Sequence, residues 1–111
     1  MAHSKAAEIR RLNDCFRKNP VLLGKVMLTA NVNAHGWAFT QKCLQSVKSY
    51  DAFTNDNDPH HEHDFGAFEV DGVELFFKID YYDYNMIGGS DDPANPACTV
   101  RVLTIMERTE Y

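Results

Sequence analysis

The dipeptide Asp71-Gly72, between two apolar runs in "FGAFEVDGVELFFKID", is the feature that most constrains the fold. A two-residue type I′ turn needs positive φ at both central residues, and Asp-Gly is one of the pairs that adopts it most readily. Such a turn fixes the register of its two strands. The sequence therefore predicts an antiparallel hairpin in which residue 70 faces residue 73 and later pairs step outward by one.

This register sorts the hairpin into two faces. One face places Phe68 opposite Leu75 and Gly66 opposite Phe77, so we expect it to join the core. The other face places Glu69 opposite Glu74. Like charges in that position are slightly destabilising unless they are solvated or meet a cation or a basic partner.

The same register predicts a candidate catalytic pair on the second face. It sets His63 opposite Asp80, with Lys78 one step away, and His61 opposite Tyr82 if pairing continues. A carboxylate beside an imidazole fixes its tautomer and raises its basicity, which is the geometry of a general base. It is equally the geometry of a structural hydrogen bond, and both interpretations stay open.

The remaining elements suggest a helix-covered sheet. We expect a helix capped by Ser4 and running to about Lys18, a half-buried strand over 24–32, a helix over 35–50 and a central last strand over 99–107. The order is α-β-α-β-β-β. We therefore predict an α+β fold, with an antiparallel sheet of about four strands and two helices packed on one face, in a single domain of residues 1–111.

Cysteine usage and hydropathy suggest a cellular compartment. Cys15, Cys43 and Cys98 are odd in number and widely spaced, which is typical of free thiols in a reducing compartment. Cys15 and Cys43 fall on apolar helix stripes, where we expect them to fill the core. No apolar stretch approaches membrane-spanning length, so we expect a soluble, cytoplasmic protein.

Charge is distributed unevenly along the chain. Residues 1–50 contain eight Lys/Arg and two acidic residues, whereas residues 51–111 contain three Lys/Arg and fourteen acidic residues. The net charge of -5 therefore conceals an acidic second half. An acidic face would repel nucleic acid and attract a basic protein surface, or simply keep the protein soluble.

The segment "NDNDPHHEHD", residues 55–64, has ligand-type side chains but matches no metal motif. An EF-hand starting at Asp56 fails because His61 and Ala67 stand where Gly and Glu are needed, and no HExxH is present. If the segment held a divalent metal, its ligands would be Asp58, His60, His63 and Asp64. The alternative is a turn-rich loop, and we expect no cofactor.

Aromatic residues amid acids favour a protein-binding face. Tyrosines can stack on nucleic-acid bases, but the surrounding acidic residues have the wrong sign for a phosphate backbone. Tyrosine is a common anchor of protein interfaces. The predicted binding face consists of Glu62, Asp64, Glu69, Glu74, Tyr81, Tyr82, Asp83 and Tyr84.

Several stretches carry a resemblance to a known family. They include "FTNDNDPHHEHDFGAFEVDG", "FFKIDYYD" and "DPANPACTVRVLTIM". In these, the chain resembles small bacterial proteins known only as a domain of unknown function, often carried on plasmids and mobile elements. The resemblance implies a complete single-domain protein with no assigned chemistry. The family pattern usually has Gly at the position of His61, whereas Glu62, His63 and Asp64, together with Lys78 and Asp80, fit it.

Two functions from different classes follow. The first is a non-enzymatic acidic protein, such as an anti-CRISPR or anti-restriction inhibitor, that mimics DNA and occupies a basic nucleic-acid-binding surface of a host complex. The second is a small metal-dependent or His/Asp-based hydrolase using the HEHD segment. The absence of a recognisable nucleophile favours the first. An open apolar patch around Phe65 and Phe76 would also favour a homodimer.

Overall fold

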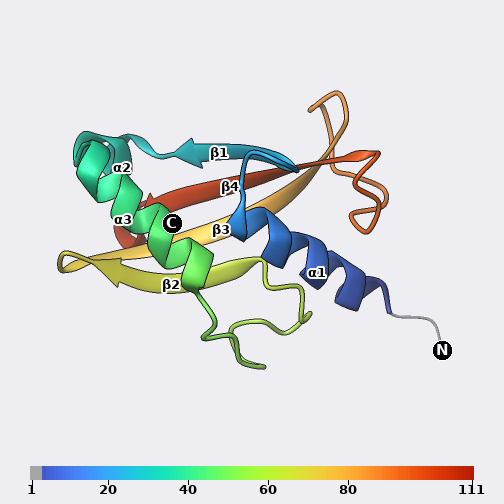
Figure 1. Cartoon of the computed structure of the whole chain (residues 1–111), viewed down its shortest axis with the longest axis horizontal. Helices are drawn as coiled ribbons and strands as arrows, with labels where there is room; N and C mark the ends of the chain where they lie inside the picture. The colour runs from blue at the N-terminus through green and yellow to red at the C-terminus, as the bar shows by residue number, and fades with distance from the viewer. Residues whose placement is uncertain (1–3) are drawn as a thin grey trace.

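The computed structural model describes residues 4–111, which fold into a four-stranded sheet with its two long helices on one side (Figure 1). In chain order the elements are α1 (Lys5–Lys18), β1 (Gly24–Leu28), α2 (Ala30–Ala34), α3 (Trp37–Ser49), β2 (Phe65–Val70), β3 (Val73–Asp83), β4 (Thr99–Glu107) and the 3-10 turn η1 (Arg108–Glu110). The predicted first helix is confirmed, because Ser4 Oγ accepts from the Ala7 N–H at its start.

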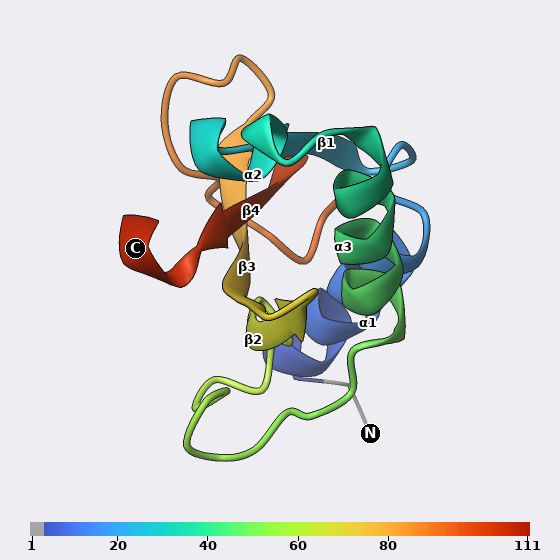
Figure 2. The same ribbon diagram turned by 90° about the vertical axis from the view of Figure 1, so that its left-hand side faces the viewer.

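The sheet has the order β1-β4-β3-β2. Strands β2, β3 and β4 are antiparallel, and Figure 2 shows α1 and α3 on the same side of them. The α+β prediction, with a mostly antiparallel sheet of four strands, is confirmed, and β4 is central as expected. Strand β1 instead pairs parallel to β4, which local sequence does not reveal because the two strands lie some 70 residues apart.

The short helix α2 occupies part of the strand predicted over 24–32. The strand ends at Leu28, and Thr29 begins the helix. The Thr29 N–H still donates to the Ile105 carbonyl, while its hydroxyl donates to Glu110 Oε1 at 2.6 Å. Thr29 therefore pins the turn between β1 and α2 to the C-terminal turn, and alternation of apolar residues alone did not predict this stop.

The β2–β3 hairpin forms as predicted. Asp71 has φ of 52° and Gly72 has φ of 82°, as a type I′ turn requires. The register pairs Glu69 with Glu74 and continues to Phe65 opposite Lys78, where the ladder of β2 ends.

The core lies between the sheet and the helices. From the sheet it receives Leu75, Phe77, Ile79, Leu103 and Ile105; from the helices, Phe16, Val32, Phe39, Cys43 and Val47. Each such buried apolar side chain contributes about 1.5–3 kcal/mol. Gly66 permits the closest packing, since a Cβ there would lie 2.4 Å from the Phe77 ring.

The two helix cysteines differ in placement. Cys43 is buried in the core as predicted, and burial raises the pKa of its thiol to about 11. Cys15 is exposed, so its predicted core role is wrong. The stripe that α1 buries runs instead through Leu12, Asn13 and Phe16.

Helix α1 lies between the two long connections, residues 50–64 and 84–98 (Figures 1 and 2). Lys5 forms an ion pair with Asp92 at 3.7 Å, and Arg10 Nη1 donates to the His61 carbonyl at 3.1 Å. The basic first helix therefore meets acidic segments from the second half of the chain, and part of the charge asymmetry cancels within the domain.

Candidate functional site

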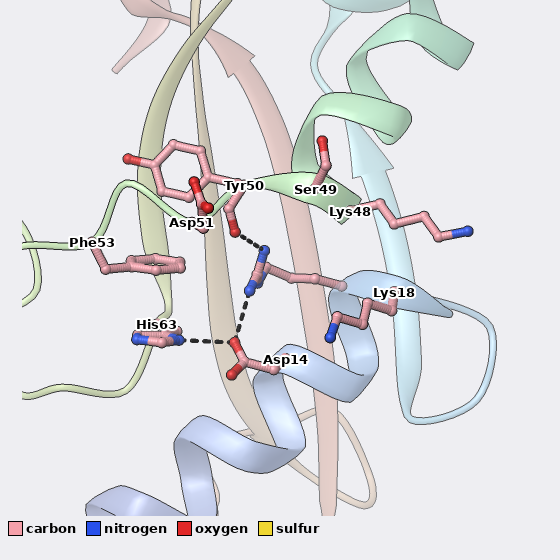
Figure 3. Close-up of a pocket in the computed structure, with 9 residues that line it drawn as sticks. Asp14, Lys18, Lys48, Ser49, Tyr50, Asp51, Phe53 and His63 are labelled. Carbon is pink, nitrogen blue, oxygen red and sulfur yellow. Dashed lines mark hydrogen bonds and ion pairs between the residues drawn. The ribbon is translucent and has the colours of Figure 1, made fainter.

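A pocket of about 410 Å³ lies between α1, the end of α3 and the connection that follows α3 (Figure 3). Its lining residues are Asp14, Arg17, Lys18, Lys48, Ser49, Tyr50, Asp51, Phe53 and His63. It brings a histidine, carboxylates and cations together, so it is the place where the predicted chemistry of His63 has to be judged.

Asp14 joins two other side chains of this pocket, those of Arg17 and His63. Its Oδ1 lies 2.9 Å from His63 Nδ1 and accepts from Arg17 Nη2 at 2.7 Å. Partial burial raises the pKa of Asp14, but the hydrogen bonds from Arg17 and His63 outweigh burial and hold the pKa below its ordinary value. Asp14 is therefore a bridging carboxylate.

Arg17 secures the end of α3. Its guanidinium is buried, and Nη1 donates to the carbonyls of Val47 at 2.8 Å and Tyr50 at 3.0 Å. Carbonyls in the last turn of a helix lack intrahelical partners, so this arginine supplies the missing donors. The guanidinium also lies 5.1 Å from the centre of the Phe53 ring.

His63 is held on three sides. Its ring stacks on Phe53 with centroids 3.8 Å apart and planes 3° apart, and its Nε2 lies 3.7 Å from Asp58 Oδ2. Asp58 is buried, and its Oδ1 accepts from the N–H groups of Glu62 and His63. Both ring nitrogens of His63 thus face carboxylates of the same chain.

The predicted His63–Asp80 pair is wrong. Asp80 is bonded to Lys78 at 2.6 Å, which raises the pKa of the lysine, and it is paired with Val102 across the sheet. His61 and His63 both have positive φ, 57° and 56°, so the chain turns toward α1 before β2 begins. For the same reason His61 does not pair with Tyr82, which lies opposite Val100 and Gly89.

A second group of polar side chains joins α1 to the sheet and to the loop before β2. Asn13 Nδ2 donates to the Glu62 carbonyl and to the Tyr81 hydroxyl, and Arg101 Nε donates to Asn13 Oδ1 at 2.7 Å. The Tyr81 hydroxyl donates to Glu62 Oε1 at 2.8 Å, and Arg101 Nη2 donates to the Pro93 carbonyl. Burial raises the pKa of Tyr81 and lowers that of Arg101.

We call these two groups together the α1 seam. Its members are Asn13, Asp14, Arg17, Asp58, Glu62, His63, Tyr81 and Arg101. Two of its buried nitrogens, Arg17 Nε and Arg101 Nη1, have no hydrogen-bond partner among residues 4–111. The hydrogen bonds of the α1 seam join α1 both to the loop before β2 and to the centre of the sheet.

The residues of the predicted binding face lie in three places. Glu62 and Tyr81 belong to the α1 seam, and the nearby Asp64 is half-buried, with its pKa raised by burial. Glu69 and Glu74 are exposed near the hairpin turn, where Arg108 Nη1 bonds Glu74 at 2.9 Å. The other members, Tyr82, Asp83 and Tyr84, stand at the far end of β3. Their predicted role in binding stays a prediction.

The four residues suggested as ligands of a divalent metal do not form a metal-binding group in the part of the chain that the structure describes. Within residues 4–111, no group of three His, Cys, Asp or Glu side chains is arranged to hold a metal ion. Of the four suggested ligands, His63 Nε2 lies 3.7 Å from Asp58 Oδ2, and Asp64 directly precedes β2, where its carbonyl accepts from the Ile79 N–H.

Several members of the α1 seam escaped the sequence prediction. Asn13 and Arg17 lie on the same helix stripe as Leu12 and Phe16, and Arg101 occupies a buried position of the central strand β4. A polar residue on a buried stripe was the signal, because such a residue needs a partner from elsewhere in the chain.

The fold and the seam define a small α+β domain in which one helix is joined to a mixed sheet through buried polar contacts. The chain belongs to the family described as "Protein of unknown function (DUF3768)", whose family model matches residues 28–110. No curated protein and no solved structure matches this chain. Among residues 4–111, no helix has both the length and the apolar character needed to cross a membrane.

Proposed function

We propose that this protein is a non-enzymatic binding protein whose acidic connections engage a basic surface of a protein partner. The observation that carries the proposal is the charge of the two segments beside α1. Residues 51–64 and 84–98 contain no Lys or Arg, and they expose Asp51, Asp56 and Asp91, which have no ion-pair partner among residues 4–111. Exposed charge of one sign steers a partner of the opposite sign.

The alternative, a hydrolase built on His63, has less support. A general base needs a nitrogen within hydrogen-bond reach of the substrate, and both nitrogens of His63 face Asp14 or Asp58. The histidine also stacks on Phe53. These contacts favour a role for His63 in holding the loop before β2 against α1.

The finer proposal concerns the kind of partner. A small acidic protein that lacks an evident catalytic group is suited to occupying a nucleic-acid-binding surface in place of DNA. A mobile-element setting, which the sequence resemblance implies, would make host defence complexes such as CRISPR or restriction assemblies the targets. On this proposal the chain acts as an inhibitor by competing with nucleic acid.

Charge-neutralising variants test the proposal. The acidic surface is removed in the triple variant Asp51→Asn, Asp56→Asn, Asp91→Asn, and the matched control removes exposed cations in Lys18→Gln, Lys25→Gln, Lys48→Gln. Tagged forms are used to capture partners from the native host, and the captured partner is identified by mass spectrometry. We expect capture to fall at least tenfold in the acid-neutralised variant, and to persist in the lysine variant.

Competition with nucleic acid tests the finer step. The captured partner, once purified, is bound to its nucleic acid and titrated with the wild-type chain while the bound fraction is measured. Loss of nucleic-acid binding supports inhibition, whereas a ternary complex contradicts DNA mimicry. Equal capture by the acid-neutralised and lysine variants contradicts the acidic interface itself.

A further inference from the structure

The turn after β3 presents apolar side chains to solvent on a fixed backbone. We call residues 84–89 the Tyr84 loop, which lies where β3 gives way to the connection that projects beyond the sheet in Figure 1. Ile87 is 86% exposed and Tyr84 is 74% exposed, and Met86 beside them is also exposed. No other element described within residues 4–111 covers these side chains.

Asp83 holds the loop in shape. Its Oδ1 accepts from the Ile87 N–H at 3.0 Å, and its Oδ2 accepts from the Gly88 N–H at 3.2 Å. The backbone of Asp83 adds two more bonds, accepting from the Met86 N–H and donating to the Gly88 carbonyl. A bridge between Tyr82 and Gly89 closes the base of the loop.

Met86 shows that these contacts impose the loop's shape. Its φ is 61°, in the left-handed region that a long side chain rarely adopts. Such a conformation persists where the surrounding contacts determine it, and it recurs at binding sites that are preorganised. A preorganised loop loses less conformational freedom on binding than a flexible one.

The charge around the loop indicates the kind of partner. Residues 79–100 contain four acidic residues, Asp80, Asp83, Asp91 and Asp92, and no Lys, Arg or His. Asp91 is exposed, whereas Asp80 and Asp92 have cationic neighbours. An acidic margin around exposed Tyr and Ile complements an apolar pocket with a basic rim, and it opposes docking on an anionic membrane surface.

We propose that the Tyr84 loop is the anchor of the interface: Tyr84 and Ile87 enter an apolar pocket, bordered by basic residues, on the protein partner. This inference rests on the proposed binding function and names the contact that supplies its specificity. Asp83, predicted from sequence as a contact residue, is on this proposal a positioning residue that orders the loop. Ile87 is a proposed contact that the sequence prediction did not include.

Matched substitutions of exposed apolar residues test the anchor. The probe is the partner captured by the wild-type chain, purified and titrated by calorimetry with each variant. Ile87→Ser and Tyr84→Ser are each expected to weaken binding at least tenfold. Val21→Ser is the control, because Val21 is 81% exposed in a different loop. It is expected to bind as the wild type does.

A second measurement tests the order of the loop without a partner. Hydrogen exchange of the Ile87 and Gly88 amides is compared between the wild type and Asp83→Ala, and we expect exchange at least tenfold faster in the variant. Equal exchange in the two proteins would overturn the positioning role of Asp83.

The remaining outcomes separate this inference from the proposed function. If the wild type captures a partner that binds Ile87→Ser as tightly as Val21→Ser, the anchor is overturned while the binding function stands. Failure of the wild type to capture any partner contradicts the binding function as well. Sedimentation showing a wild-type dimer that Ile87→Ser dissociates would assign the loop to a second copy of this chain and overturn the proposal of a different partner.

Discussion

The α1 seam and the Tyr84 loop meet on β3, yet their side chains are in opposite chemical situations. In the seam, the histidine, the carboxylates and the arginines that suggest reactivity are bonded to one another or to backbone groups. In the Tyr84 loop, hydrogen bonds hold the backbone and the apolar side chains have no cover. A dense group of titratable residues is therefore weak evidence of a catalytic site when each has a partner within the chain.

This comparison changes where function is sought. Buried polar groups that satisfy one another specify how a helix sits on a sheet, because each misplaced partner leaves a desolvated group unpaired. Exposed apolar groups on an ordered backbone add nothing comparable to the fold, since they remain in water. Substitutions in the two regions are accordingly expected to affect different measurements.

The largest expected effect is on the buried centre of the seam. Asn13→Ala removes the acceptor of Arg101 Nε, which is buried, and the donor to Glu62 and Tyr81, which are partly buried. We expect the free energy of unfolding in urea to fall by about 3 kcal/mol, because a buried guanidinium loses a partner. Asn33→Ala, at an exposed position of α2, is the control and should change it by less than about 0.5 kcal/mol. A similar small change in both variants would show that the seam does not hold the fold.

The next effect distinguishes the observed partner of His63 from the predicted one. A double-mutant cycle between His63→Ala and Asp14→Ala should give a coupling of about 1 kcal/mol, since the two side chains are in hydrogen-bond contact. The same cycle between His63→Ala and Asp80→Ala should give a coupling near zero, because Asp80 bonds Lys78 on the other face of the sheet. Coupling to Asp80 instead of Asp14 would restore the register predicted from sequence and contradict the turn at His63.

Acid should weaken the seam through Asp14. The folded pKa of Asp14 lies below its ordinary value of 3.8, so its ionised form adds stability at higher pH that is lost as pH falls below that value toward the folded pKa. The difference in free energy of unfolding between the wild type and Asp14→Asn should therefore be greatest near neutral pH and shrink below about pH 4. Urea unfolding of both proteins from pH 7 to pH 2.5 measures it. A difference that stays constant across this range would mean that the charge of Asp14 contributes nothing to the free energy of unfolding.

The smallest expected effect is on the Tyr84 loop. Ile87→Ser should change the free energy of unfolding by less than about 0.5 kcal/mol, because the side chain is exposed and meets no core residue. Thermal and urea unfolding check this value. Destabilisation of more than about 1 kcal/mol would place Ile87 with the structural residues and weaken the comparison on which its binding role depends.

The sequence alone determined the features that depend on neighbouring residues. Asp71-Gly72 fixed the turn and the register of its two strands. The positive φ of these two residues defines the turn, and the apolar alternation beside them follows the resulting pairs. Ser4 and the apolar stripe predicted α1, and alternation in the hairpin predicted its buried face.

Only the tertiary structure decided the partners of polar side chains and the faces left uncovered. Asp14 and His63 lie 49 residues apart, and Asn13 and Arg101 lie 88 residues apart. The first contact depends on the positive φ of His61 and His63, and the second depends on how α1 packs against the sheet. Extending the hairpin register past Phe65 predicted Asp80 as the partner of His63. That prediction failed because β2 begins only at Phe65, and the backbone of residues 62 and 63 is bonded to Asp58 instead. Local pattern sets which way a strand alternates, whereas burial and long-range hydrogen bonds set where it ends and what its last side chains meet.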